Sequence, residues 1–207
     1  MSFVQKLLPA AAAVLAFTAT PALADAITFD SSDIGTAYTL NYNGFSDSTT
    51  VNGLTASTTF TLTSISGNTY NFSYSVTNTS TAPITGSRVS SFAFNTDPTI
   101  SGASSTGAFS YTTLNGSYPN GIGGVDVCFK DASTGACSGG GSGGLTQGQT
   151  GTGTFSLTFS QPVSSLTLSD FYVRYQSISG AGNITSASGA GTQSSSGGTS
   201  VPEPGML

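Results

Sequence analysis

The sequence predicts an all-β protein, an antiparallel two-sheet β-sandwich of jelly-roll type. Apolar and polar residues alternate with a period of two along most of the chain, which is typical of strands with one buried and one exposed face. Asn-Gly pairs and segments containing Pro separate these stretches at a spacing close to that of sandwich folds. A parallel β-helix is disfavoured, because the chain contains no repeat of fixed period.

The first 24 residues have the three parts of a secretory signal peptide. Lys6 supplies a positive charge, residues 7–17 form a short apolar run, and an Ala-Leu-Ala cleavage site ends at Ala24. The apolar run is too short to span a bilayer, which takes about 20 residues. We therefore expect signal peptidase to cut between Ala24 and Asp25 and the protein to be exported.

Residues 25–179 are predicted to form the β-domain. Aromatic and branched apolar residues alternate with Asn, Ser and Thr in residues 70–76 and in residues 154–159, as strands with one exposed face require. Turns are predicted at Asn-Gly pairs, including those that start at Asn43 and Asn52.

The last alternating segment of this domain changes parity. Leu168 and Phe171 fall on opposite parities, and a shift of one residue turns side chains to the other face of a strand. A strand buried on both faces would explain this, but Asp170 and Arg174 would be costly there. We therefore predict a β-bulge at Asp170.

Two Gly-rich segments are predicted to be flexible. Residues 180–200 form a Gly- and Ser-rich run with one Ile, no aromatic residue and no charge. Such a segment buries too little apolar surface to offset its conformational entropy, so we expect a disordered C-terminal linker. Residues 139–144 are expected to form a shorter flexible loop inside the domain.

The composition excludes much ordinary chemistry. Charged residues are 6% of the chain, and there is no His, so a Ser-His-Asp triad, a Cys-His pair and a His-containing zinc site are excluded. The net charge of −5 includes only four basic residues, which cannot form a phosphate-binding face, so we predict no nucleic-acid partner. Ser and Thr make up about a third of the chain, and a surface of hydroxyls and amides suits a secreted or matrix environment.

The two cysteines, Cys128 and Cys137, are predicted to form a disulfide. An even number of cysteines in an exported chain favours pairing, and the turn-like residues 131–135 between them bring the two Cα atoms within bridging range. The closed loop is short, so the stabilisation is about 2.7 kcal/mol. A redox or metal-binding pair is poorly supported, because there is no Cys-x-x-Cys spacing and no His.

Aspartates are the remaining candidates for chemistry. Asp30 with Asp33, and Asp126 with Asp131, offer carboxylates to Ca²⁺, but their spacing matches no complete calcium loop, and Asp at strand ends commonly caps turns. Two Asp could also serve as the acid and base of a glycosidase, although nothing in the sequence singles out a pair. We predict no catalytic residue, no metal site and no cofactor, with Ca²⁺ as the alternative.

Tyrosines are the candidates for glycan contact. Tyr70 and Tyr74 lie in a strictly alternating strand and are expected in the core, whereas Tyr111 and Tyr118 lie in a region rich in Gly, Ser and Asn. Exposed Tyr rings suit the apolar faces of sugars. The other tyrosines expected on such a platform are Tyr38, Tyr42 and Tyr172.

The chain ends in Val201-Pro202-Glu203-Pro204-Gly205-Met206-Leu207, directly after the Gly- and Ser-rich run. Here it resembles the PEP-CTERM proteins, exported proteins of Gram-negative bacteria in which Pro-Glu-Pro begins a C-terminal sorting signal processed by an exosortase. The matching motif residues are Val201, Pro202, Glu203 and Pro204. The Cys pair is similar to that of a subgroup called the cistern family. The transmembrane helix and Arg cluster of that signal do not follow in this sequence, so the chain is either cut short or lacks the anchor.

The resemblance implies a protein of the cell surface or of an exopolysaccharide matrix, with signal peptidase and an exosortase-type enzyme as processing partners and residues 201–207 as the start of the sorting signal. We therefore expect a non-catalytic exported protein. The alternative is a carbohydrate-binding module that uses the exposed tyrosines.

Overall fold

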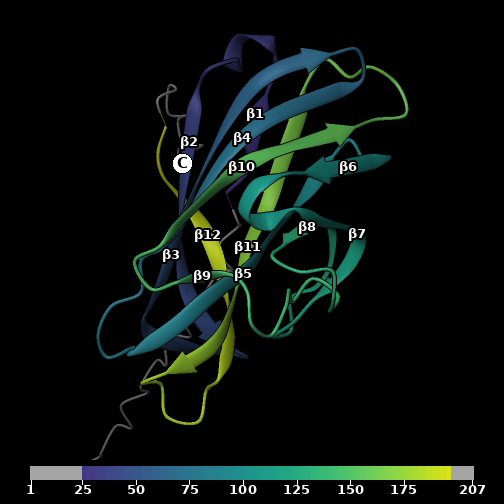
Figure 1. Ribbon diagram of the computed structural model, residues 1–207. Helices are drawn as coiled ribbons and strands as arrows, with labels where there is room; N and C mark the ends of the chain where they lie inside the picture. The colour runs from purple at the N-terminus through teal and green to yellow at the C-terminus, as the bar shows by residue number, and fades with distance from the viewer. Residues whose placement is uncertain (1–24, 197–207) are drawn as a thin grey trace, which may run out of the picture.

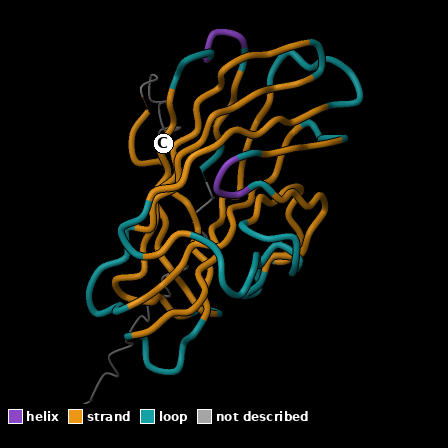
Figure 2. The backbone as a smooth tube through the Cα atoms, viewed as in Figure 1, coloured by secondary structure: helices purple, strands orange, loops and turns teal. Residues whose placement is uncertain are grey.

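The structure, a computed structural model, describes residues 25–196 and consists almost entirely of strands (Figures 1 and 2). Two single-turn 3-10 helices interrupt them, η1 (Ser31–Asp33) and η2 (Gly107–Phe109). The expected signal peptide and the Pro-Glu-Pro motif lie outside the described residues. The strands are β1 (Ile27–Phe29), β2 (Ala37–Ser46), β3 (Thr49–Ser66), β4 (Thr69–Asn78), β5 (Gly86–Asp97), β6 (Gly102–Ser105), β7 (Tyr111–Tyr118), β8 (Gly123–Lys130), β9 (Leu145–Thr146), β10 (Thr150–Thr158), β11 (Leu166–Ser179) and β12 (Ser186–Ser196).

The prediction of an all-β antiparallel fold is confirmed, but the two-sheet sandwich is wrong. The strands form one antiparallel sheet in the order β6-β10-β4-β3-β2-β12-β11-β5-β8-β7, with β1 added to β11 and β9 added to β5. This sheet curls until it is nearly closed into a barrel (Figure 1). Its two halves, β6-β10-β4-β3-β2 and β11-β5-β8-β7, are the two layers that a sandwich would have. Strand β12 joins them into one sheet.

Strand β12 lies inside the segment that was expected to be a linker, so the sheet extends beyond the predicted domain boundary at residue 179. It pairs with β11 along one edge and with β2 along the other. Its buried inward positions hold the small residues Ala187, Gly189 and Gly191. An added Cβ at Gly189 would lie 3.0 Å from the side chains of Val173 and Tyr175. The neighbouring strands therefore supply the buried apolar side chains, and β12 supplies backbone hydrogen bonds. The composition of residues 180–200 did not indicate this arrangement.

The barrel closes through side chains where β6 and β7 approach each other. The hydroxyl of Ser105 donates to the carbonyl of Phe109 at 2.6 Å and lies 3.3 Å from the hydroxyl of Thr112. Phe109, in the short helix η2 between these strands, is fully buried. The gap is thus filled by an aromatic ring, and these two strands remain the ends of the hydrogen-bonded order.

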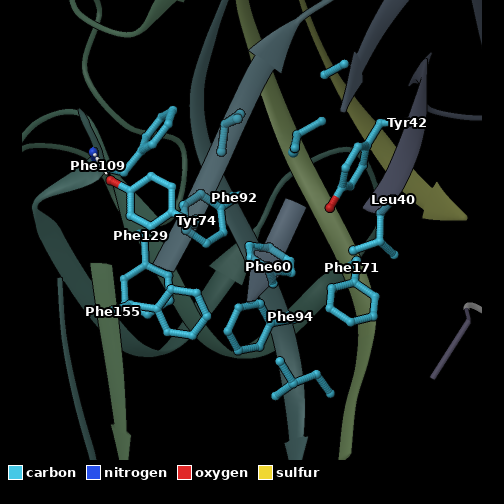
Figure 3. Packing of buried hydrophobic residues seen from close by; sticks show 14 of the residues in the cluster. Leu40, Tyr42, Phe60, Tyr74, Phe92, Phe94, Phe109, Phe129, Phe155 and Phe171 are labelled. Atoms are coloured by element: carbon cyan, nitrogen blue, oxygen red, sulfur yellow. Dashed lines mark hydrogen bonds between the residues drawn. The ribbon is translucent and has the colours of Figure 1, made fainter. Parts of the chain in front are cut away.

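The core is a cluster of aromatic rings contributed by both halves of the sheet (Figure 3). The ring of Phe60 on β3 lies 5.6 Å from that of Phe92 on β5 and 6.0 Å from that of Phe171 on β11. Phe155 on β10 lies 5.0 Å from Phe129 on β8. Truncating one such ring to Ala costs about 3–5 kcal/mol, so these contacts hold the two halves face to face.

The buried polar end of Tyr74 is satisfied within this core. Its hydroxyl accepts from the backbone N–H of Phe109 and donates to the carbonyl of Thr106 (Figure 3). Tyr70 is also fully buried, so the predicted core positions of both tyrosines are confirmed.

The predicted β-bulge at Asp170 is confirmed. The pairing of β11 with β5 shifts register between Ser169 and Tyr172, and Asp170 has a φ of 52°. Here the partner on the other edge of β11 changes from β1 to β12. The Asn-Gly pairs at Asn43 and Asn52 were not turns: both lie inside strands, and the chain reverses between β2 and β3 next to Asp47, with a φ of 51°.

Candidate functional site

The outer surface of the sheet has two chemically different halves. Strands β2, β3, β4, β6 and β10 contain no Asp, Glu, Lys or Arg. Their outward positions, which alternate with buried ones, hold mainly Thr and Ser. We call the outward residues of β2, β3, β4 and β10 the hydroxyl face. They include Thr39, Ser57, Thr59, Thr61, Ser73, Ser75, Thr77, Thr150, Thr152, Thr154 and Ser156.

Hydroxyls of the hydroxyl face meet in pairs across the strands. Thr39 on β2 lies 2.9 Å from Thr59 on β3, oxygen to oxygen, and Thr77 on β4 lies 2.8 Å from Thr150 on β10. Such cross-strand pairs each stabilise a sheet by roughly 0.2–1 kcal/mol. The result is a neutral surface of hydroxyl pairs, each of which bridges two strands that lie about 4.8 Å apart.

The opposite half, β11-β5-β8-β7, carries charged residues and a covering loop of residues 131–144, which we call the clamped loop. Side chains of the sheet donate to its carbonyls. Lys130 donates to Gly135 at 2.8 Å, Ser90 donates to Ser138 at 2.6 Å, and Arg88 donates to the carbonyls of Gly141 and Gly143. The prediction of a flexible loop at residues 139–144 is therefore wrong, because its backbone acceptors are bound to the sheet.

The disulfide between Cys128 and Cys137 is confirmed, with the two Cα atoms 5.7 Å apart. It ties the clamped loop to the outer face of β8, where both cysteines are buried. An added Cβ at Gly116 would lie 2.2 Å from the sulfur of Cys137. Glycine at this position lets β7 pass directly over the bridge.

Two buried cations belong to this half. Lys130 is 4% exposed, and burial lowers the pKa of its amine, against the opposing effect of the adjacent Asp131 carboxylate. Arg174 is 8% exposed; it donates to Asn120 at 3.1 Å, while its Nε has no hydrogen-bond partner among the described residues. Burial lowers the pKa of Arg174 as well. These cations hold backbone and amide oxygens, which is a structural role.

The predicted glycan-contact tyrosines have different outcomes. Tyr111 is 45% exposed, as expected. Tyr118 is 2% exposed, and its hydroxyl lies 3.0 Å from that of Ser91, so its predicted place on an exposed platform is wrong. Asn115 has a positive φ of 50°, and at this residue the side chains of β7 change between the inner and outer faces of the sheet. Beyond it, Tyr118 packs in the cluster around the disulfide.

Of the other expected platform residues, Tyr38 and Tyr42 are buried. Tyr172 is partly exposed, and its ring lies 5.8 Å from that of Tyr118, tilted by 30°. Burial, and then the nearby Asp170 carboxylate, raise the pKa of Tyr172. One partly exposed aromatic ring therefore lies on this half with a second ring packed against it.

Four polar side chains, the polar row, lie side by side across four strands next to Tyr172. They are Asp170 on β11, Asn95 on β5, Asp126 on β8 and Asn115 on β7. The amide of Asn95 donates to Asp170 at 3.0 Å and accepts from the backbone N–H of Asp126 at 3.0 Å. The row is thus oriented by hydrogen bonds within the sheet.

Three of the four residues of the polar row line an open depression of about 450 Å³. Asn95, Asn115 and Asp126 contribute to its wall, together with Gly116, Gly124 and Val125. Gly124 is exposed and has no side chain, which leaves the backbone of β8 accessible at this point. Asp126 and Tyr172 were candidates from the sequence, but as parts of different hypotheses. Asn95 was missed, because an outward Asn in an alternating strand carries no further signal.

The other aspartates that were candidates for Ca²⁺, Asp30, Asp33 and Asp131, accept hydrogen bonds from backbone N–H groups. Asp30 accepts from the N–H of Ser32 at 2.7 Å, and Asp33 accepts from the N–H of Asp30 at 2.9 Å, which makes a capping box on η1. Asp131 accepts from the N–H of Gly140 at 2.7 Å. Within residues 25–196, no three His, Cys, Asp or Glu side chains gather closely enough to hold a metal ion.

Comparison with family models, with curated proteins and with solved structures found no match to this chain. In the part of the chain that the structure describes, no helix is long and apolar enough to cross a membrane.

Proposed function

We propose that the protein is exported and acts without catalysis at the cell surface or in an extracellular exopolysaccharide matrix, delivered by an exosortase-type sorting system. The hydroxyl face carries this proposal. A charge-free surface of paired hydroxyls offers hydrogen-bond donors and acceptors to a hydrated neutral polymer. Binding through such a surface depends little on the salt concentration. The signal-peptide pattern before Asp25, the motif at Pro202-Glu203-Pro204 and the disulfide support export.

The test is to locate and sequence the native protein in its producing cells. We expect it in the matrix or surface fraction, with an N-terminus at Asp25 and release after enzymatic digestion of the polysaccharide. An intact-mass measurement reports any processing near Val201. Recovery from the cytoplasm with Met1 in place would contradict export.

A carbohydrate-binding module is the second candidate function. The observation that favours it is the open depression lined by Asn95, Asn115 and Asp126. Asp170 is hydrogen-bonded to Asn95, and Tyr172 packs on the cluster that contains the wall residue Val125. Incubation with oligosaccharides also tests the non-catalytic proposal, because the appearance of shorter products would contradict it.

A further inference from the structure

The polar row has hydrogen-bonding capacity that the protein does not use. Asp126 accepts from the N–H and hydroxyl of Thr96 through Oδ2, and Asp170 accepts from Asn95 through Oδ2. Among the hydrogen bonds of the described residues, none involves Oδ1 of either aspartate or the side-chain amide of Asn115. Asn115 and Asp126 line the depression, and Asp170 adjoins it through its hydrogen bond with Asn95, so the free groups can bind a single ligand.

We propose that this depression binds a short stretch of neutral glycan. Sugar hydroxyls donate to the free carboxylate oxygens of Asp126 and Asp170 and bond to the amide of Asn115, while the ring of Tyr172 contacts the apolar face of a sugar. The inference rests on the carbohydrate-binding function proposed above and names its site and its ligand class.

Charge restricts the ligand to neutral sugars. Two carboxylates in one row repel uronic acids and sulfated sugars, and they accept hydrogen bonds from hydroxyls more strongly than neutral acceptors do. Another depression, of about 340 Å³, lies on the hydroxyl face. Its wall is made of Ser, Thr, Asn71 and two buried Phe residues, and therefore offers neither a carboxylate nor an exposed aromatic ring.

Backbone conformation allows variants that change the ligand groups without straining the fold. Asn115 and Asp170 have φ values of 50° and 52°, a region that Gly and Asn adopt readily. Asn115→Gly removes the amide, and Asp170→Asn removes the charge. Asp47→Asn is the matched control, because Asp47 is exposed at a φ of 51° in the β2–β3 turn. For Tyr172→Ala the control is Tyr111→Ala, since Tyr111 is the exposed tyrosine outside the depression.

The experiment measures binding of cellohexaose, mannohexaose, xylohexaose and hexagalacturonate to the full exported chain by calorimetry, with a thermal melt of every variant. We expect at least one neutral hexasaccharide to bind and hexagalacturonate not to bind. Asp170→Asn and Asn115→Gly should each weaken binding about fivefold, Tyr172→Ala should weaken it more, and both controls should bind as the original chain does.

Three outcomes overturn the inference. If no neutral hexasaccharide binds while the protein still co-sediments with its native matrix, the site is wrong and matrix association stands. If a hexasaccharide binds equally well to all folded variants, the carbohydrate-binding function is supported but its site lies elsewhere. If hexagalacturonate binds as tightly as the neutral sugars, the assigned ligand class is wrong.

Discussion

The phenol ring of Tyr42 lies against Gly191: a Cβ added at this glycine would be 2.7 Å from Cε1 of Tyr42. This approach lets a strand of small residues lie beneath the large side chains of its neighbours. We predict that Gly191→Val lowers the free energy of unfolding by about 1–3 kcal/mol through overpacking, measured by urea denaturation. Ala190→Val, at the adjacent exposed position, is the control and should leave stability nearly unchanged. Equal stability of the two variants would mean that β12 is not packed as described.

Removal of β12 should unfold the domain. Without this strand, β2 and β11 each lose a ladder of backbone hydrogen bonds, and the two halves of the sheet lose their connection. We expect a chain of residues 25–196 to melt at the temperature of the mature protein and a chain of residues 25–185 to aggregate or show no cooperative transition. Thermal denaturation followed by circular dichroism measures both. A cooperative melt of the shorter chain would restore the linker interpretation.

Two buried tyrosines allow a matched test of hydrogen-bond satisfaction. The buried hydroxyl of Tyr175 has no hydrogen-bond partner among residues 25–196, whereas that of Tyr42 lies 2.9 Å from the hydroxyl of Thr58. We predict that Tyr175→Phe is neutral or stabilising and that Tyr42→Phe destabilises by about 1 kcal/mol, because only the latter breaks a bond. Chemical denaturation of the two variants gives the comparison. A larger loss for Tyr175→Phe would show that its hydroxyl has a partner in solution.

The disulfide should hold the clamped loop. The bridge between Cys128 and Cys137 closes a short loop, and its loss should cost at most about 3 kcal/mol. We expect the Cys128→Ala/Cys137→Ala double variant to fold, to melt at a lower temperature, and to exchange the backbone amides of residues 131–144 faster. Hydrogen exchange read by mass spectrometry measures this, with strand β4 as the internal reference. Free alkylation of both thiols in the folded original chain would contradict the bridge.

Stability should fall at alkaline pH. Burial, and then the hydrogen bond that Tyr38 donates to Asp33 at 2.7 Å, raise the pKa of Tyr38 to about 12, against about 10 in an unfolded chain. Below about pH 10 both states keep the proton, so the stabilisation is complete; above it the unfolded state loses its proton first, and stability falls until about pH 12. Urea denaturation across this range should show the decline. Tyr38→Phe should make it shallower, and an unchanged slope would show that Tyr38 does not contribute.

The alternation of large apolar residues was sufficient to predict most strands and their buried faces. Tyr70 and Tyr74 show this, since strict period-two spacing with aromatic residues leaves one face to be buried. The bulge at Asp170 was predictable for a related reason: a change of parity in a half-buried strand requires an extra residue. The disulfide could be predicted from the even number of cysteines in a chain expected to be exported and from the turn-like residues between them.

What the sequence concealed depended on contacts between distant segments. Strand β12 has small residues at its buried inward positions because Tyr42 and Tyr175 fill the space. Tyr42 lies on β2, far away in the sequence, and Tyr175 lies on the neighbouring strand β11. Without β12 the two halves of the sheet look like separate layers, so missing this strand also led to the incorrect prediction of a two-sheet sandwich. Likewise, the carbonyls of the clamped loop are held by Arg88, more than 50 residues earlier, and the burial of Tyr118 depends on the change of face at Asn115.

The position of β12 also sets the order in which the protein can fold. Asn41 on β2 has its partner at Thr192, 151 residues further along the chain, and contacts of such high contact order form slowly. During synthesis or transport one edge of β2 and one edge of β11 therefore remain unpaired until β12 arrives, and unpaired edges favour association with other chains. The chain is most vulnerable to aggregation in that interval, before its own C-terminal strand occupies the place that a neighbouring molecule could take.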